Sequence, residues 1–508
     1  MKRTLLCALL AASLLWAAPK KPKLVVAIVL DQFRYDYVTR FRGDYTQGFN
    51  RLLTKGALFT HVNYVHFPTV TAVGHSTFLT GATPSVSGIV GNDWFDHEEG
   101  KHVTSVSDSK TQLLGGTGEG ASPHRLLVST VGDELKMAGG KSRVIGISLK
   151  DRAAILPAGH MANAAYWFDL KTGNFVSSTY YFAELPGWVK DVNNGHPGEK
   201  YRGVTWLGHK LPDDPKELYG NSDVSPLEQS PFGNDLLEVF AERALAAEQL
   251  GKHEAADLLA VSFSSHDKVG HHYGPYSPEE REVSIATDKV LERLFQAIDR
   301  QVGLDNVVVV LTADHGVAPS AEEDTANHMP GGRMPANLVR GAIQAALTKK
   351  YGEGEWVLGS WDLSIYLNTD LIAKKNLDPA EVRRLAAETA MGIPHIFRVY
   401  TRDQLLTGSV PGDEVSRRVM NGFNVRRSPD IAFLPDPYWL VTKDVTTHGT
   451  PFGYDSHVPV IFMGSGIRPG RYDAAATVND IAPTLATILD VETPSGSVGR
   501  VLTEMFAQ

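Results

Sequence analysis

Five short runs of almost purely apolar residues constrain the fold more than any other feature of this chain. The first, residues 23–30, reads Lys-Leu-Val-Val-Ala-Ile-Val-Leu and ends on Asp31. A run without polar alternation predicts a strand that is buried on both faces, as in a parallel sheet. Similar runs occupy residues 144–149, 257–263, 306–312 and 457–463.

Amphipathic stretches separate these apolar runs. Residues 235–250 and 278–302 both have the spacing of a helix with one apolar face. Strands that alternate with helices predict a doubly wound α/β core, with a mostly parallel central sheet flanked by helices. In such sheets ligands bind beyond the carboxyl ends of the strands, so the side chains that follow each run are candidate site residues.

Two regions depart from this alternation of strands and helices. Residues 162–230 are rich in Gly, Pro, Asn and Trp, which predicts an irregular insertion. Residues 321–442 have a pattern of their own, which predicts an inserted α+β cap. We therefore expect a core formed by residues 19–320 and 443–508. Within the cap we expect helices at 336–351 and 379–391 and strands at 361–367 and 396–400.

The first eighteen residues have the layout of a secretory signal peptide. Lys2 and Arg3 precede an apolar run that ends near Ala17 and Ala18, although Trp16 is unusual at the cleavage site and leaves an uncleaved anchor as the alternative. Cys7, the only cysteine, lies inside this segment. A mature chain without thiols, exported through such a signal, predicts a periplasmic or secreted protein.

Composition excludes some partners. The 508 residues carry a net charge of -9, with a pI near 6.1, whereas a general nucleic-acid binder is usually basic. No other apolar run approaches membrane-spanning length, so we expect no membrane contact beyond the signal segment. Length and composition leave a monomer or a homodimer equally open.

A run of hydroxyl side chains without charges is a candidate nucleophile region. It reads Phe-Pro-Thr-Val-Thr-Ala-Val-Gly-His-Ser-Thr from Phe67 and precedes a helix-like segment. A helix N-terminus attracts anions, but a threonine hydroxyl needs a base or a metal for activation. The alternative is an ordinary threonine cap of a helix.

Carboxylates and imidazoles follow the predicted strands. Asp267 and His271 are four residues apart, so on a helix they share one face. The remaining candidates are Asp31, Asp314, His315 and His457. Oxygen and imidazole ligands without sulfur suit zinc, and a pair of zinc ions about 4 Å apart suits displacement at phosphorus.

Basic and amide side chains complete the candidate site. Lys150 and Arg152 follow the second apolar run and could hold phosphoryl oxygens, with Arg able to contact two of them. Asn92 could donate a hydrogen bond from its amide. Each of these residues could instead lie in an ordinary surface turn.

Several motifs recur in order along the chain, among them Thr69-Val-Thr-Ala-Val-Gly-His, Thr80-Gly-Ala-Thr-Pro, Asp267-x-x-Gly-His and Thr312-Ala-Asp-His-Gly. With these motifs the chain resembles the type I phosphodiesterase/nucleotide pyrophosphatase branch of the alkaline phosphatase superfamily. The resemblance continues through Tyr454-Asp-Ser-His-Val-Pro and Val478-Asn-Asp-Ile-Ala-Pro, in order over nearly the whole mature chain. It implies an alkaline phosphatase-like fold.

The resemblance also implies residue roles. Thr71 would be the nucleophile that forms a phospho-threonine, beside a zinc held by Asp31, Asp314 and His315. A second zinc would be held by Asp267, His271 and His457, with His448 as the rival of His457. Asn92, Lys150 and Arg152 together look like the set of the bacterial threonine-dependent alkaline phosphatases.

The resulting prediction is an exported two-zinc phosphatase that hydrolyses small phosphate monoesters. A monoester is a dianion with three oxygens to stabilise, which favours a site with two cations and an amide beyond the metals. The alternatives are a phosphodiesterase or nucleotide pyrophosphatase on the same scaffold and a catalytically silent binding protein. A sulfatase is disfavoured because the nucleophile stretch lacks a Cys or Ser followed by x-Pro-x-Arg.

Overall fold

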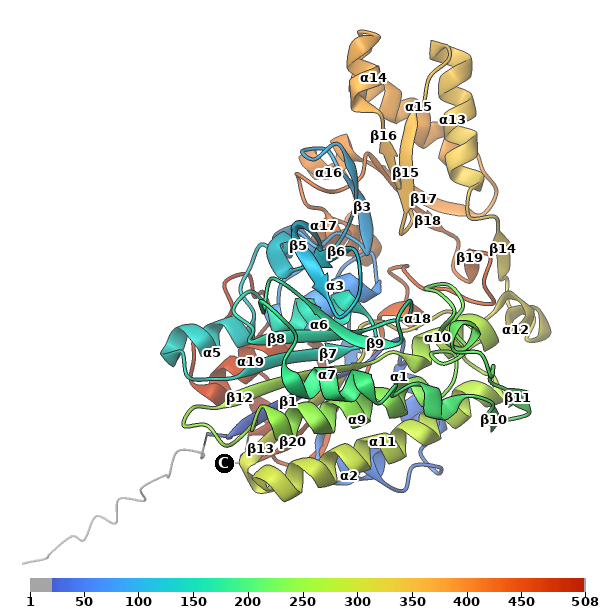
Figure 1. Ribbon diagram of the computed structural model, residues 1–508. Helices are drawn as coiled ribbons and strands as arrows, with labels where there is room; N and C mark the ends of the chain where they lie inside the picture. The colour runs from blue at the N-terminus through green and yellow to red at the C-terminus, as the bar shows by residue number, and fades with distance from the viewer. Residues whose placement is uncertain (1–20, 507–508) are drawn as a thin grey trace, which may run out of the picture.

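A computed structural model describes residues 21–506 of the chain. An eleven-stranded mixed sheet forms its centre (Figure 1). In spatial order its strands are β21 (Gly470–Thr477), β2 (Ala57–Asn63), β20 (Val460–Gly464), β13 (Val307–Thr312), β1 (Leu24–Leu30), β12 (Asp257–Phe263), β7 (Val144–Ser148), β8 (Ala164–Asp169), β9 (Asn174–Ser178), β5 (Ser107–Leu114) and β6 (Glu119–Ala121).

The middle of the sheet is parallel. β13, β1, β12, β7 and β8 pair in parallel, and β1, β12 and β13 are buried along their whole length. This burial explains why the strands read as unbroken apolar runs. Antiparallel pairs join β20 to β13 and to β2 on one side, and β8, β9, β5 and β6 on the other. The predicted doubly wound core is confirmed: its central strands are parallel, and a further parallel pair, β2 with β21, lies at one edge.

Helices cover both faces of this sheet, as Figure 1 shows. One layer contains α3 (Thr71–Thr80), α5 (Val131–Gly139), α6 (Asp151–Ala158) and α19 (Ile481–Leu489). The opposite layer contains α2 (Gly48–Lys55), α7 (Gly187–Asn194), α9 (Phe232–Ala247) and α11 (Pro278–Val302). Two apolar layers on one sheet give a continuous core, and the predicted helices correspond to α9 and α11.

Two local expectations differ from the structure. Residues 162–230 are not wholly irregular, because β8 and β9 in this segment join the central sheet. The last apolar run begins as a strand only at Val460, and it runs antiparallel to β13.

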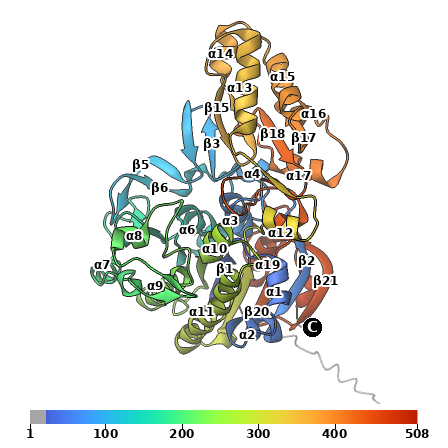
Figure 2. The same cartoon turned by 90° about the vertical axis from the view of Figure 1, so that its right-hand side faces the viewer.

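A second unit, here named the upper unit, stands above the sheet in Figures 1 and 2. Its four-stranded sheet has the order β15 (Val357–Trp361), β16 (Ser364–Leu367), β18 (Ile431–Pro435) and β17 (Ile396–Thr401). Helices α13 (Leu338–Tyr351) and α15 (Pro379–Met391) pack on it around the buried Trp356. These elements lie close to the predicted cap elements, and the division into core and cap remains a prediction. Beside β15 lies β3 (Asp93–Asp96), which comes from the sequence around Asn92.

The predicted signal peptide, residues 1–18, lies outside the described residues. Within residues 21–506, no helix has the length and apolar character needed to cross a bilayer.

Candidate active site

Thr71 is the first residue of α3. The chain is extended at Val70 and turns into the helix at Thr71, whose side chain is nearly inaccessible. Gly74, one turn later, lies against β13, since a Cβ there would meet the main-chain oxygen of Asp314 at 2.1 Å. The glycine therefore lets the start of α3 approach the end of β13 closely.

A first cluster of potential ligands lies where β1 and β13 end. Because these strands pair in parallel, Asp31, Asp314 and His315 emerge at the same edge of the sheet. The Nε2 of His315 lies 3.4 Å from Asp314 Oδ2 and 3.6 Å from Asp31 Oδ1. These three buried atoms make no hydrogen bond. His315 Nδ1 lies 2.9 Å from Gly316 O, so the proton belongs on Nδ1 and the lone pair of Nε2 faces the carboxylates.

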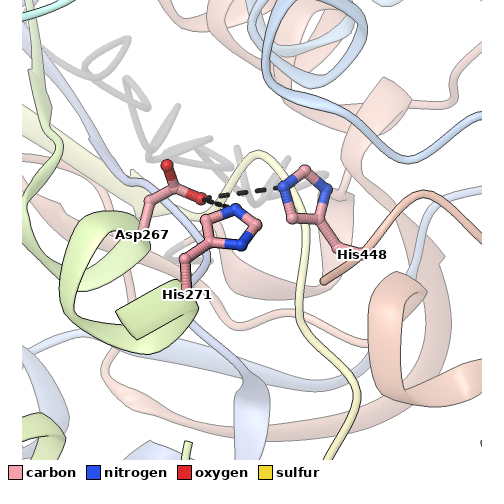
Figure 3. A group of neighbouring side chains, drawn as sticks. All are labelled: Asp267, His271 and His448. Carbon is pink, nitrogen blue, oxygen red and sulfur yellow. Dashed lines mark ion pairs between the residues drawn. The ribbon is translucent and has the colours of Figure 1, made fainter. Parts of the chain in front are cut away.

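A second cluster joins α10 (Ser265–Tyr273) to the loop after β19 (Trp439–Val441), as Figure 3 shows. Asp267 Oδ1 lies 3.2 Å from His271 Nε2 and 3.7 Å from His448 Nε2. Both histidines direct Nδ1 at a main-chain oxygen, His271 at Thr446 and His448 at Thr69, each at 2.9 Å. In both rings the Nε2 lone pair is thereby oriented toward the carboxylate.

The predicted ligand His457 lies elsewhere, and this prediction is corrected. Its Nε2 is 2.8 Å from Thr60 O, and its ring stacks on Tyr35 with centroids 4.4 Å apart. The residue bridges to Asn63 in β2, away from Asp267 and His271. His448 occupies the third position of this cluster instead.

Burial perturbs the charges of both clusters. Burial, and next the charge of Asp31, raises the pKa of Asp314 well above its usual range. Burial also lowers the pKa of His315 to about 3 and that of His448 well below its usual range. Burial opposes ionisation of Asp267 as well, yet Lys150 and His271 hold its pKa well below the usual value. Crowded carboxylates facing neutral imidazoles form a donor set suited to a divalent cation.

Lys150 lies between the two clusters. Its Nζ is 2.5 Å from Asp31 Oδ2 and 2.6 Å from Asp267 Oδ2, and the residue is 8% exposed. Although burial opposes it, the two carboxylates raise the pKa of Lys150. The Lys150 ammonium thus pairs with one carboxylate of each cluster, and the residue also lines the cavity of the site.

One open cavity of about 410 Å³ brings six of the predicted site residues together, whereas Asp31, Asp314 and His315 are not part of its lining. Asn92 is oriented at its wall, because its Oδ1 accepts the N–H of Ala72 at 2.8 Å and the amide NH2 is left to donate. The predicted residues that line the cavity are Thr71, Asn92, Lys150, Arg152, Asp267 and His271, together with His448.

Three residues of the site were not anticipated. Gln32 donates from Nε2 to Asp267 Oδ1 at 2.8 Å and from its main chain to Asp314 Oδ1 at 3.0 Å, with φ of 63°. His75 Nδ1 lies 2.8 Å from Thr71 O. Asp362, from the upper unit, accepts the main-chain N–H of Asn92 at 2.8 Å. Proximity to Asp31 and Thr71 in sequence could have indicated the first two, whereas Asp362 carries no such signal.

Comparison with known proteins now assigns the chain to a family. A model of the type I phosphodiesterase/nucleotide pyrophosphatase family matches residues 25–457, and the chain belongs to this family. It is 36% identical to the alkaline phosphatase PafA of Elizabethkingia meningoseptica, over 100% of this chain and 99% of the relative. It is also 36% identical to the alkaline phosphatase PhoV of Synechococcus elongatus, over 96% and 93% of the two chains.

Solved structures agree with this assignment. The crystal structure of wild-type PafA matches with a TM-score of 0.89 and 35% identity, over 97% of this chain and 100% of the other. Murine ectonucleotide pyrophosphatase/phosphodiesterase 5 matches with a TM-score of 0.56 at 16% identity, which shows a common fold. The resemblance and the fold class predicted from the sequence are confirmed.

Proposed function

We propose that this protein is an exported, zinc-dependent alkaline phosphatase that hydrolyses phosphate monoesters through a phospho-threonine at Thr71. The observation that carries the proposal is the cavity that joins Thr71, Asn92, Lys150 and Arg152 to the cluster of Asp267, His271 and His448, with Lys150 also paired to Asp31 of the other cluster. The two full-length relatives that are alkaline phosphatases support it. Export rests on the signal peptide predicted from the sequence of residues 1–18.

The donor atoms fit two zinc ions. Zinc accepts carboxylate oxygen and imidazole nitrogen, and here both kinds of atom converge, with those of Asp31, Asp314 and His315 buried and without hydrogen bonds. Bound zinc would supply Lewis acidity, which lowers the pKa of a nearby hydroxyl and neutralises phosphoryl charge. One ion would be held by Asp31, Asp314 and His315, and the other by Asp267, His271 and His448.

The chain's own groups perform the transfer. Thr71 Oγ1 loses its proton to solvent and bonds to phosphorus while the bond from phosphorus to the leaving oxygen breaks, and the leaving oxygen takes a proton from water. A second water then attacks phosphorus and breaks its bond to Oγ1, which releases phosphate and restores the threonine hydroxyl. The N-terminus of α3 directs its positive dipole at this position. The Asn92 amide donates to a phosphoryl oxygen, and Lys150 and Arg152 stabilise the negative charge.

Charge favours the monoesterase over a diesterase. A monoester dianion presents three non-bridging oxygens, whereas a diester is monoanionic and needs room for a second group. Beyond the metals, the cavity wall provides two cations and an amide for these oxygens. Removal of these cations is therefore expected to affect monoesters more strongly than diesters.

The test compares p-nitrophenyl phosphate with bis(p-nitrophenyl) phosphate on the purified zinc-loaded enzyme. We expect a preference for the monoester, and we expect Lys150→Ala with Arg152→Ala to reduce monoester turnover far more than diester turnover. A strong diester preference would support the phosphodiesterase alternative instead. Thr71→Ala should abolish turnover of both substrates while Thr71→Ser retains it, and an inactive wild-type protein would favour the binding-protein alternative.

A further inference from the structure

The upper unit reaches the active site through one carboxylate. Asp362 lies in the turn between β15 and β16, and its Oδ2 accepts the main-chain N–H of Asn92 at 2.8 Å. The two residues are 270 positions apart in the sequence. Figures 1 and 2 both show β3, which begins directly after Asn92, rising beside β15.

The turn that carries Asp362 is held in an unusual conformation. Asp362 and Leu363 have φ of 47° and 60°, the left-handed region that side chains with a Cβ disfavour. The N–H of Phe433 in β18 donates to Leu363 O at 3.0 Å, which ties the turn to the neighbouring strand. Such a conformation persists only where the surroundings fix it, so the direction of the carboxyl is set by the upper unit.

Gly91, the residue before Asn92, leaves room for this contact. A Cβ on Gly91 would lie 2.7 Å from Asp362 Oδ2, closer than two such atoms can approach. Only glycine at this position lets the carboxyl reach the N–H of Asn92. The carboxyl is also desolvated there, since burial raises the pKa of Asp362 to about 7. The N–H of Asn92 satisfies this desolvated oxygen, so the positions of the carboxyl and of Asn92 are matched to each other.

A chain of hydrogen bonds leads from this contact to the nucleophile. Asp362 fixes the main chain of Asn92, and Asn92 Oδ1 accepts the N–H of Ala72 at 2.8 Å. Ala72 directly follows Thr71 in the first turn of α3. Displacement of the Asn92 main chain would therefore change both the direction of its amide NH2 and the support of the residue after the nucleophile.

We infer that Asp362 is a positioning residue for phosphoryl transfer, through which the upper unit fixes Asn92 against the start of α3. The inference rests on the proposed function, in which Asn92 donates to a phosphoryl oxygen. Within residues 21–506, no hydrogen bond or ion pair joins Asp362 to Thr71 or to the ligand clusters, although the charge of Arg152 partly offsets the rise in the pKa of Asp362. The part of its effect that the hydrogen bond carries should therefore be visible only where Asn92 is present. A positioning role of Asp362 can therefore be distinguished from a role in folding alone.

The experiment is a double-mutant cycle on the zinc-loaded enzyme with p-nitrophenyl phosphate. Asp362→Ala should lower kcat/KM by about 3- to 10-fold, the value of one hydrogen bond. In the Asn92→Ala background the same substitution should change kcat/KM by less than about 2-fold, because the positioned amide is already absent. Asp362→Asn keeps an oxygen acceptor and should restore most of the activity. Asp370→Ala, an exposed aspartate of the same unit, is the matched control and should leave activity unchanged.

Equal losses in the two backgrounds would overturn the inference, since they would show a structural role independent of Asn92. An unchanged kcat/KM in Asp362→Ala would overturn it as well. Gly91→Ala gives an independent check, because it displaces the carboxyl without removing it and should cause a similar loss. Failure of the proposed function itself would appear differently, as turnover that persists in Thr71→Ala.

Discussion

Substitution of Gly74 by alanine tests how closely α3 lies against β13. In an exposed helix interior, glycine to alanine stabilises by about 1 kcal/mol, because alanine has the higher helix propensity. At Gly74, however, the new Cβ would meet Asp314 O at 2.1 Å and the Asp314 Cα at 2.7 Å. Overpacking of this kind costs about 1–3 kcal/mol, and contact with main-chain atoms that cannot rotate away belongs at the upper end of that range. The net effect is therefore a loss of about 2 kcal/mol.

Activity should fall together with stability. Relief of the clash moves the first turn of α3 away from Asp314, and Thr71 is part of that turn. The assay is urea unfolding followed by kcat/KM on p-nitrophenyl phosphate. Gly341→Ala is the matched control, because Gly341 lies in α13 with nothing within 4 Å of its Cβ position, and it should be stabilised by up to about 1 kcal/mol. If Gly74→Ala were stabilised like the control, the close approach of helix and strand would be refuted.

Three further predictions follow from the site and the core. His448→Ala should lower bound zinc from about two ions toward one per chain, whereas His457→Ala should leave it unchanged by elemental analysis; the reverse result would restore His457 as the ligand. Gln32→Leu should weaken zinc retention in a chelator titration, since the Gln32 side-chain amide orients Asp267, and unaltered retention would contradict that role. Burial lowers the pKa of His66 to about 3, so the folded state binds fewer protons than the unfolded state between this value and about 6.5. Stability should therefore fall with acid more steeply in the metal-free wild type than in metal-free His66→Phe, by up to about 1.4 kcal/mol per pH unit, and parallel slopes would contradict the assignment.

The parallel strands, the three residues of the first ligand cluster and two of the three in the second could be predicted from the sequence because their signals are local. An apolar run followed by Asp31, or Asp267 and His271 at helical spacing, needs no knowledge of distant contacts. The assembly of the clusters also followed, since parallel neighbours end at one edge of the sheet.

His448 and Asp362 show where such reasoning stops. His457 precedes a strand, and β20 runs antiparallel to β13, so His457 was a plausible candidate near the same edge. Pairing with Asn63 of β2, however, holds His457 away from the second cluster. The loop that contains His448 reaches Asp267 instead. The contact of Asp362 with Asn92 depends on how the upper unit stands over the sheet, which no local pattern encodes.

The most direct test of the central claim is a crystal structure of the zinc-loaded enzyme with phosphate, measured with anomalous scattering at the zinc edge. We predict two anomalous peaks, one contacting Asp31, Asp314 and His315 and the other contacting Asp267, His271 and His448. The phosphate should lie between these peaks and the side chains of Thr71 and Asn92. Peaks located away from these clusters, or a phosphate out of reach of Thr71, would contradict the proposed chemistry.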